Sequence, residues 1–147
     1  MICFGLLLFL KSPFSLSSLS QNFSGTHTFY SAKEIEDDNI NVVINGNGFL
    51  INCSTEYAKS FSKRLNQKFV KGESFSFVGE DNDVCKLLKM LDGVVKKVEC
   101  FDDIKVFYVY APKISQFIDV DGQKINVQIA KNKGVITVGT PLILGSF

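Results

Sequence analysis

Few residues of this sequence carry side chains that commonly act in catalysis, and their spacing matches no catalytic motif. The single histidine, His27, has no Ser or Cys motif beside it that would pair a nucleophile with a base. The carboxylate pairs at residues 37–38 and 102–103 lie next to turn-like stretches, where acidic side chains are usually solvated. NGNG at residues 45–48 lacks the third glycine and the following helix of a dinucleotide-binding loop. We therefore expect no enzyme, no cofactor and a histidine at the surface.

Metal binding is equally unsupported by the residue spacing. The four cysteines, Cys3, Cys53, Cys85 and Cys100, form no Cys-x-x-Cys pair. Because Cys3 lies in the apolar N-terminal stretch, three remain, and the sequence does not decide which two of them would form a disulfide or whether all are small buried apolar residues. The acidic cluster at residues 80–83 lacks the alternating ligand series of a calcium loop, so we interpret it as a helix cap formed by Asp81, Asn82 or Asp83.

One basic helix is the candidate for contact with an anion or with DNA. Its candidate residues are Lys59, Lys63, Arg64 and Lys68. The alternative is that they form the solvated side of a helix that packs on the core. Residues 21–147 lack Lys11 and so carry 15 basic and 15 acidic side chains, whereas a general nucleic-acid binder has a basic excess. We therefore do not expect a nucleic-acid partner.

The N-terminal 20 residues differ from the rest of the sequence. An apolar run of nine residues after Met1 ends at Lys11, which is too short to span a bilayer and has the length of a signal-peptide core. Ser18 and Ser20 are small residues at the spacing of a cleavage site before Gln21, although no basic residue precedes the apolar run. We expect export to the cell envelope or medium, with membrane contact only if the segment stays uncleaved as an anchor. The alternative is a buried N-terminal element of a cytosolic domain.

The remaining 127 residues, 21–147, are long enough for a single domain with its own core, and their patterns predict the elements. We expect a strand at residues 26–32 and a hairpin around the turn at 45–48. A helix capped by Ser54 should follow, with Ala58, Phe61, Leu65 and Phe69 on its buried side. After a strand near residues 73–79, a second helix opens at the acidic cluster and ends at Asp92-Gly93.

Strand patterns dominate the second half. We expect strands at 94–101 and 104–112, a turn at 119–123, a strand at 124–130, a hairpin loop at 130–134 and a closing strand from Val135. The uncharged tail then contains Gly139-Thr140-Pro141 as a bulge or strand margin, and Leu142 to Leu144 as core. The order of elements predicts an α+β fold: a curved, mainly antiparallel sheet with two packed helices.

A faint internal repeat accompanies this pattern. INVVINGNG at residues 40–48 matches INVQIAKNKG at residues 125–134, and a strand follows each. The match arises either by chance between two hairpins or from a duplication in which each half contributes a hairpin and a helix.

Residues 84–147 resemble the C-terminal domain of the YwmB family, extracytoplasmic proteins of Gram-positive bacteria often labelled TATA-box-binding. The matching stretches are VCKLLKMLDG, VFYVYAP, KINVQIA and VGTPLIL, of which the last, with Gly139, Thr140 and Pro141, is the most specific. Members of that family are longer and carry an additional N-terminal domain, so the chain resembles a reduced member. The resemblance implies a sheet-and-helix shape like that of TATA-binding protein, and shape alone does not imply DNA binding.

Three functional hypotheses follow. The leading one is a non-enzymatic envelope domain that contacts a protein or a cell-wall component. The second is a DNA-binding sheet, which would require Lys59, Lys63, Lys68, Lys96, Lys97 and Lys105 to gather on one concave face. The third is a small-ligand binding protein or hydrolase, which would require a pocket with converging polar groups.

Overall fold

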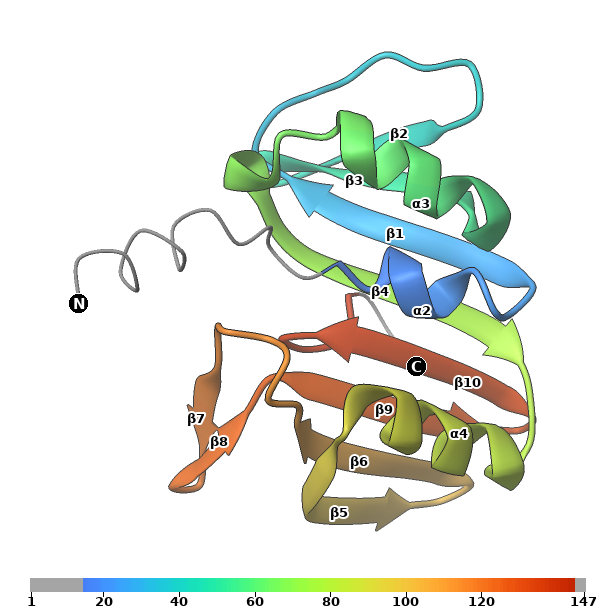
Figure 1. The fold of residues 1–147 in the computed structure, drawn as a ribbon, viewed down its shortest axis with the longest axis vertical. Helices are drawn as coiled ribbons and strands as arrows, with labels where there is room; N and C mark the ends of the chain where they lie inside the picture. Colours follow the sequence, from blue (N-terminus) through green and yellow to red (C-terminus); the bar gives the residue numbers. More distant parts are fainter. Residues whose placement is uncertain (1–14, 145–147) are drawn as a thin grey trace, which may run out of the picture.

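One antiparallel sheet of eight strands runs through residues 15–144, the part of the chain that this computed structural model describes (Figure 1). The strand order is β2-β3-β1-β4-β10-β9-β6-β5, and the α-helices lie on one face of the sheet (Figure 1). The expected α+β class, with an open antiparallel sheet and packed helices, is confirmed. A separate two-stranded sheet, β7–β8, stands beside the strands of the second half.

The first half of the chain builds one end of the sheet. Its strands are β1 (Gly25–Ser31), β2 (Asn41–Asn45), β3 (Gly48–Ser54) and β4 (Val70–Val78). The helix α3 (Thr55–Arg64) follows β3, and a short 3-10 turn, η1 (Gln67–Phe69), leads into β4. The predicted cap is confirmed, because the backbone N–H of Tyr57 donates to Ser54 Oγ at 3.2 Å. The helix ends earlier than its apolar stripe predicts, because Leu65 takes an extended conformation and Phe69 falls in the 3-10 turn.

The second half builds the other end. The helix α4 (Asp81–Leu91) is followed by β5 (Val94–Phe101), β6 (Ile104–Tyr110), β7 (Ile118–Val120), β8 (Gln123–Ile125), β9 (Val127–Asn132) and β10 (Val135–Thr140). The acidic cluster opens α4, as expected, but the N-cap is Glu80 and not Asp81, Asn82 or Asp83. Glu80 N–H donates to Asp83 Oδ2 at 2.9 Å in a capping box. The β9–β10 hairpin turns on two residues with left-handed backbone, Lys133 (φ 49°) and Gly134 (φ 79°), as two-residue hairpin loops require.

The last strand of the chain occupies the centre of the sheet. β10 pairs with β4 on one side and with β9 on the other, from Val135↔Val78 to Thr140↔Glu73 along β4. The tail that ends the sequence is therefore an internal strand, which explains its uncharged, β-branched composition. Beyond β10, Leu142 is 37% exposed, and Ile143 and Leu144 are half-buried. The expectation that Leu142 to Leu144 form core is wrong, because none of the three is buried or belongs to a buried cluster.

The two hairpins that carry the internal repeat take different places in the sheet. β2–β3 forms an edge, whereas β9–β10 lies at the centre. Counted outward from the β4–β10 junction, the counterpart of β2 is β5 and not β9. Each half does contribute four strands to the eight-stranded sheet and one long helix, but the matching sequences do not occupy matching positions.

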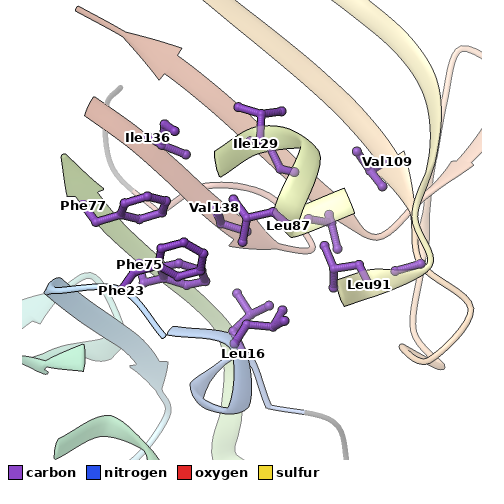
Figure 2. Packing of buried hydrophobic residues seen from close by; sticks show 14 of the residues in the cluster. Leu16, Phe23, Phe75, Phe77, Leu87, Leu91, Val109, Ile129, Ile136 and Val138 are labelled. Atoms are coloured by element: carbon purple, nitrogen blue, oxygen red, sulfur yellow. The ribbon is translucent and has the colours of Figure 1, made fainter. Parts of the chain in front are cut away.

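Two buried clusters form the core between the sheet and the helices. The larger joins α4 to β4, β6, β9 and β10 through residues such as Leu87, Ile129, Ile136 and Phe75 (Figure 2). The smaller packs Ala58 and Phe61 of α3 on Phe29 and Ile51. Phe23, Phe75 and Phe77 stack within the larger cluster, where the Phe23 and Phe77 ring centroids lie 4.2 Å apart.

A short helix, α2 (Ser17–Ser20), belongs to the larger cluster. Leu16 is fully buried and Leu19 is 5% exposed, and both belong to the cluster that contains the stacked phenylalanines. Figure 2 shows Leu16 near Phe23 and Phe75. The sequence analysis placed these residues in the leader segment, ahead of a domain starting at residue 21. The folded domain instead includes residues 15–20; the apolar run at residues 1–10 lies outside the described residues.

Removal of the buried leucine tests this boundary. We expect Leu16→Ala to lower the free energy of unfolding by about 2–5 kcal/mol, because it leaves a cavity in the larger cluster. Ser18→Ala, at an exposed position of the same helix, should change it by less than about 0.5 kcal/mol. Urea unfolding followed by circular dichroism measures both. Equal midpoints for the two variants would contradict a structural role for α2.

Candidate functional site

The sheet face opposite the α-helices is a candidate contact surface of the described chain. Strand registers place alternate residues of the central strands on this side, because neighbours such as Thr28↔Ser74 and Ser76↔Thr137 point the same way. We call this surface the polar face. Its central members are Tyr30, Thr28, Asn52, Ser74, Ser76, Thr137, Gln128 and Tyr108.

The polar face carries almost no charge. In the strands of this sheet other than the edge strand β5, no Lys, Arg, Asp or Glu that the registers pair points to this side. The registers place Glu73, Lys105 and Lys131 on the helix side. Only the edge strand β5 adds charges to the face, Lys97 and Glu99. Recognition by this surface would therefore depend on hydrogen bonds and shape.

Hydrogen bonds order the side chains of the polar face. Thr28 Oγ1 donates to Asn52 Oδ1 at 2.6 Å, and Gln128 Oε1 accepts from the backbone N–H of Ile143 at 2.9 Å. Partial burial, followed by the neighbouring Glu99 carboxylate, raises the pKa of the Tyr108 phenol above its ordinary value. Tyr108 therefore remains a neutral hydroxyl donor at physiological pH.

The Gly-Thr-Pro signature folds the tail back over this face. A Cβ at Gly139 would lie 2.4 Å from both Ile143 Cα and Leu142 O, so only glycine allows this approach of the chain. Thr140 Oγ1 donates to the backbone O of Asn126 at 2.7 Å, and Pro141 follows in the cis conformation. The three residues therefore have structural roles here.

The four basic candidates do not lie on the polar face. Lys59, Lys63 and Arg64 are exposed on α3 on the opposite side of the sheet, and Lys68 is exposed in η1. Arg64 is already bound within the chain, because its guanidinium donates to Asp37 Oδ2.

The six lysines that the DNA hypothesis requires do not lie together on one face of the sheet. Lys97 lies on the polar face of β5 with its ammonium 2.6 Å from Asp121 Oδ2, whereas Lys105 lies on the helix side of β6. β5 and α3 lie at opposite ends of the sheet (Figure 1). The geometry that the DNA hypothesis requires is absent from the described residues.

Asp37 is engaged and not merely solvated, contrary to expectation. Its carboxylate accepts from the Tyr57 hydroxyl at 2.6 Å and from the backbone N–H of Asn39 at 2.8 Å. These two bonds, and then the Arg64 guanidinium, hold the pKa of Asp37 below its usual value. The group ties the loop before β2 to α3.

His27 is fully buried, so the expectation of a surface histidine is wrong. Its Nδ1 lies 2.9 Å from Ser20 Oγ, and its Nε2 lies 3.1 Å from Glu73 Oε1. Glu73 also accepts from Ser15 Oγ at 2.7 Å and from the backbone N–H of Leu16 at 3.3 Å. The alternation His27, Phe29, Ser31 along β1, all on the helix side, was the signal that could have predicted this burial.

The Ser20, His27 and Glu73 side chains form a chain of contacts like that of a hydrolase triad. All three are at most 3% exposed, so a substrate has no access to the Ser20 hydroxyl. A cleft of about 150 Å³ lies beside Glu73, lined also by Lys71, Gln116 and Thr140. The Glu73 carboxylate is hydrogen-bonded to His27 of β1 and to Ser15 and Leu16 at the start of α2. We call this cluster the polar clamp, because it holds α2 against the sheet.

The described cysteines are all free thiols. Cys53 is buried beside His27, whereas Cys85 and Cys100 are exposed. Burial first, and the charge of Asp37 second, raise the pKa of Cys53 to about 11. Among residues 15–144 no group of three or more His, Cys, Asp or Glu side chains is arranged to hold a metal, and no helix there is long and apolar enough to cross a membrane.

Comparison of the chain with protein-family models, with characterised proteins and with solved structures finds no match. The functional conclusion therefore depends on the surfaces described above and on the sequence.

Truncation of Glu73 tests the polar clamp. We expect Glu73→Ala to lower the free energy of unfolding by about 3 kcal/mol, because His27, Ser15 and the Leu16 N–H lose a buried acceptor. Glu73→Gln keeps one acceptor oxygen, so its free energy of unfolding should lie between those of the unaltered protein and Glu73→Ala. Glu34→Ala, at an exposed site, should change stability by less than about 0.5 kcal/mol. A Glu73→Ala variant as stable as Glu34→Ala would refute the clamp.

Thiol labelling tests the burial of Cys53. At pH 8 the buried Cys53 thiol, with a pKa of about 11, stays protonated, whereas Cys85 and Cys100 are exposed to the reagent. We expect a chromogenic disulfide reagent to label Cys85 and Cys100 rapidly and Cys53 only after unfolding, read by mass spectrometry of peptides. A Cys53→Ala variant identifies the slow site. Equal labelling rates for Cys53 and Cys85 in the folded protein would contradict the structure.

Proposed function

We propose that the protein is a non-enzymatic binding domain of the cell envelope, related to the YwmB family, and that its polar face contacts a cell-wall polymer. One observation carries the proposal: the sheet face opposite the described α-helices has charge only at one edge and carries partly exposed hydroxyl, amide and phenol side chains at Thr28, Tyr30, Asn52, Ser76, Thr137 and Tyr108. The apolar N-terminal stretch and the VGTPLIL resemblance support the compartment.

The chemistry of the face suits such a partner. Hydroxyl and amide side chains can both donate and accept hydrogen bonds, and wall glycans present hydroxyl and amide groups. The two tyrosines, Tyr30 and Tyr108, add half-exposed aromatic surface with a polar tip. Binding through the uncharged centre of this face would depend little on ionic strength.

Two observations weigh against DNA binding and against hydrolysis. Minor-groove binding by a sheet requires basic and polar readers together with apolar wedges. The registers assign no Lys or Arg to the polar face other than Lys97 on the edge strand β5. Hydrolysis would require an accessible nucleophile, and Ser20 beside His27 is fully buried.

Co-sedimentation with purified cell-wall sacculi tests the proposal. We expect wall retention that is nearly equal in about 0.1 M and about 1 M salt, where the Debye length falls from about 10 to about 3 Å. Thr137→Lys puts a charge at the centre of the face and should weaken retention about tenfold or more, since an unpaired charge would be buried on contact. Ser76 lies directly opposite Thr137 on the neighbouring strand, so Ser76→Lys should weaken retention to a similar extent.

The matched control is Lys59→Thr on the helix side, which should leave retention unchanged. Circular dichroism establishes that each variant is folded. No retention of the unaltered protein by sacculi, or retention lost in Lys59→Thr and kept in Thr137→Lys, would refute the proposal. Salt-dependent binding to duplex DNA that Thr137→Lys strengthens would instead support the DNA hypothesis.

A further inference from the structure

Two consecutive Asn-Gly pairs, at residues 45–46 and 47–48, form the turn between β2 and β3. Asparagine followed by glycine is prone to deamidation, because glycine has no Cβ to hinder attack by its backbone nitrogen on the asparagine side chain. Residues 45–47 are exposed, so water reaches the turn. The turn is therefore a candidate site for this covalent modification.

The chemistry of deamidation sets a structural requirement. The backbone nitrogen of the glycine loses its proton to a base and forms a bond with the Cγ carbon of the asparagine. The bond between Cγ and Nδ2 breaks, and ammonia leaves with a proton taken from solvent. Water then opens the succinimide ring at either carbonyl and gives aspartate or isoaspartate, without oxidation or reduction. The reaction requires a glycine N–H that solvent can reach and that no hydrogen bond holds.

The two Asp-Gly pairs of the chain, which can form the same ring by losing water, do not meet this requirement. Gly93 N–H donates to Leu88 O at 2.9 Å, where α4 ends. Gly122 N–H donates to Asp119 Oδ1 at 2.8 Å in the turn between β7 and β8. Both glycine nitrogens are therefore held within the fold.

The second Asn-Gly pair is protected as well. Gly48 lies opposite Asn45 in the pair that closes this two-residue hairpin, where the Gly48 N–H donates to the Asn45 carbonyl. Gly48 is also buried, and a Cβ there would lie 2.9 Å from both Ser31 O and the Tyr30 hydroxyl. Asn47 can therefore react only after the hairpin opens.

Gly46 differs from the other three glycines. Its φ of 58° suits the first central position of a hairpin turn, and no atom lies within 4 Å of the place that a Cβ would take. Its N–H has no hydrogen-bond partner among residues 15–144. We propose that Asn45 deamidates in the folded protein, whereas the fold protects Asn47.

The product changes the charge of one corner of the sheet. Val43 lies opposite Leu50 on the polar-face side of β2, and Asn45 lies on the same side two residues further along. Aspartate or isoaspartate at this position adds a carboxylate where the registers pair no charged side chain. The reaction requires no binding partner, so it is independent of the proposed contact with a wall polymer.

Incubation of the folded, full chain at mildly alkaline pH tests the proposal, because alkali favours loss of the glycine N–H proton. Trypsin cleaves after Lys33 and Lys59 and releases both asparagines in one peptide, so fragment masses assign the conversion to a residue. We expect Asn45 to convert at least about tenfold faster than Asn47, because the Gly48 N–H must first leave its hydrogen bond and its packed position. In urea, where the hairpin is unfolded, the two rates should be nearly equal.

Asn45→Gln and Asn47→Gln are the matched variants, because glutamine keeps the amide but would have to close a larger ring, which forms more slowly. Early ammonia release from the folded protein should fall sharply in Asn45→Gln and stay unchanged in Asn47→Gln. Circular dichroism establishes that both variants are folded. Equal conversion of the two asparagines in the folded protein, or conversion of Asn45 only in urea, would overturn the proposal.

Discussion

The pairing of β4 with β10 is the interaction on which the rest of this fold depends. Within the described residues it is the hydrogen-bonded junction between the sheet of the first half and the sheet of the second half. It brings Phe75 and Phe77 beside Ile136 and Val138, so the larger cluster can form only when both halves are in register. The polar face depends on the same junction, because Ser76 and Thr137 meet across it.

Local patterns predicted most elements of the fold. Alternation in residues 26–32 gave β1, Asn-Gly pairs gave the β2–β3 hairpin, and Ser54 and the acidic cluster marked the starts of α3 and α4. These signals work because turns, caps and amphipathic stripes act over a few residues. The order of strands was not predictable, because β1 meets β4 and β4 meets β10 across long stretches of chain, and such pairing leaves no local signature.

The candidate site was predictable only in part, for the same reason. His27 has a polar side chain, which favours the surface, but its partner Glu73 lies 46 residues away. An apolar run followed by small serines is typical of a leader peptide, and the burial of Leu16 and Leu19 follows from a cluster whose other members come from distant strands and α4. The polar face emerged only when the registers aligned the uncharged sides of separate strands.

The central place of β10 also bears on how the chain reaches its fold during synthesis. Every other strand leaves the ribosome before residues 135–140, so β4 and β9 both have an open edge until the last strand is made. Until then Phe75 and Phe77 lack half of their packing, and the nascent chain stays incompletely folded. A polypeptide whose central strand is synthesised after the strands beside it keeps two sheet edges open late in its elongation.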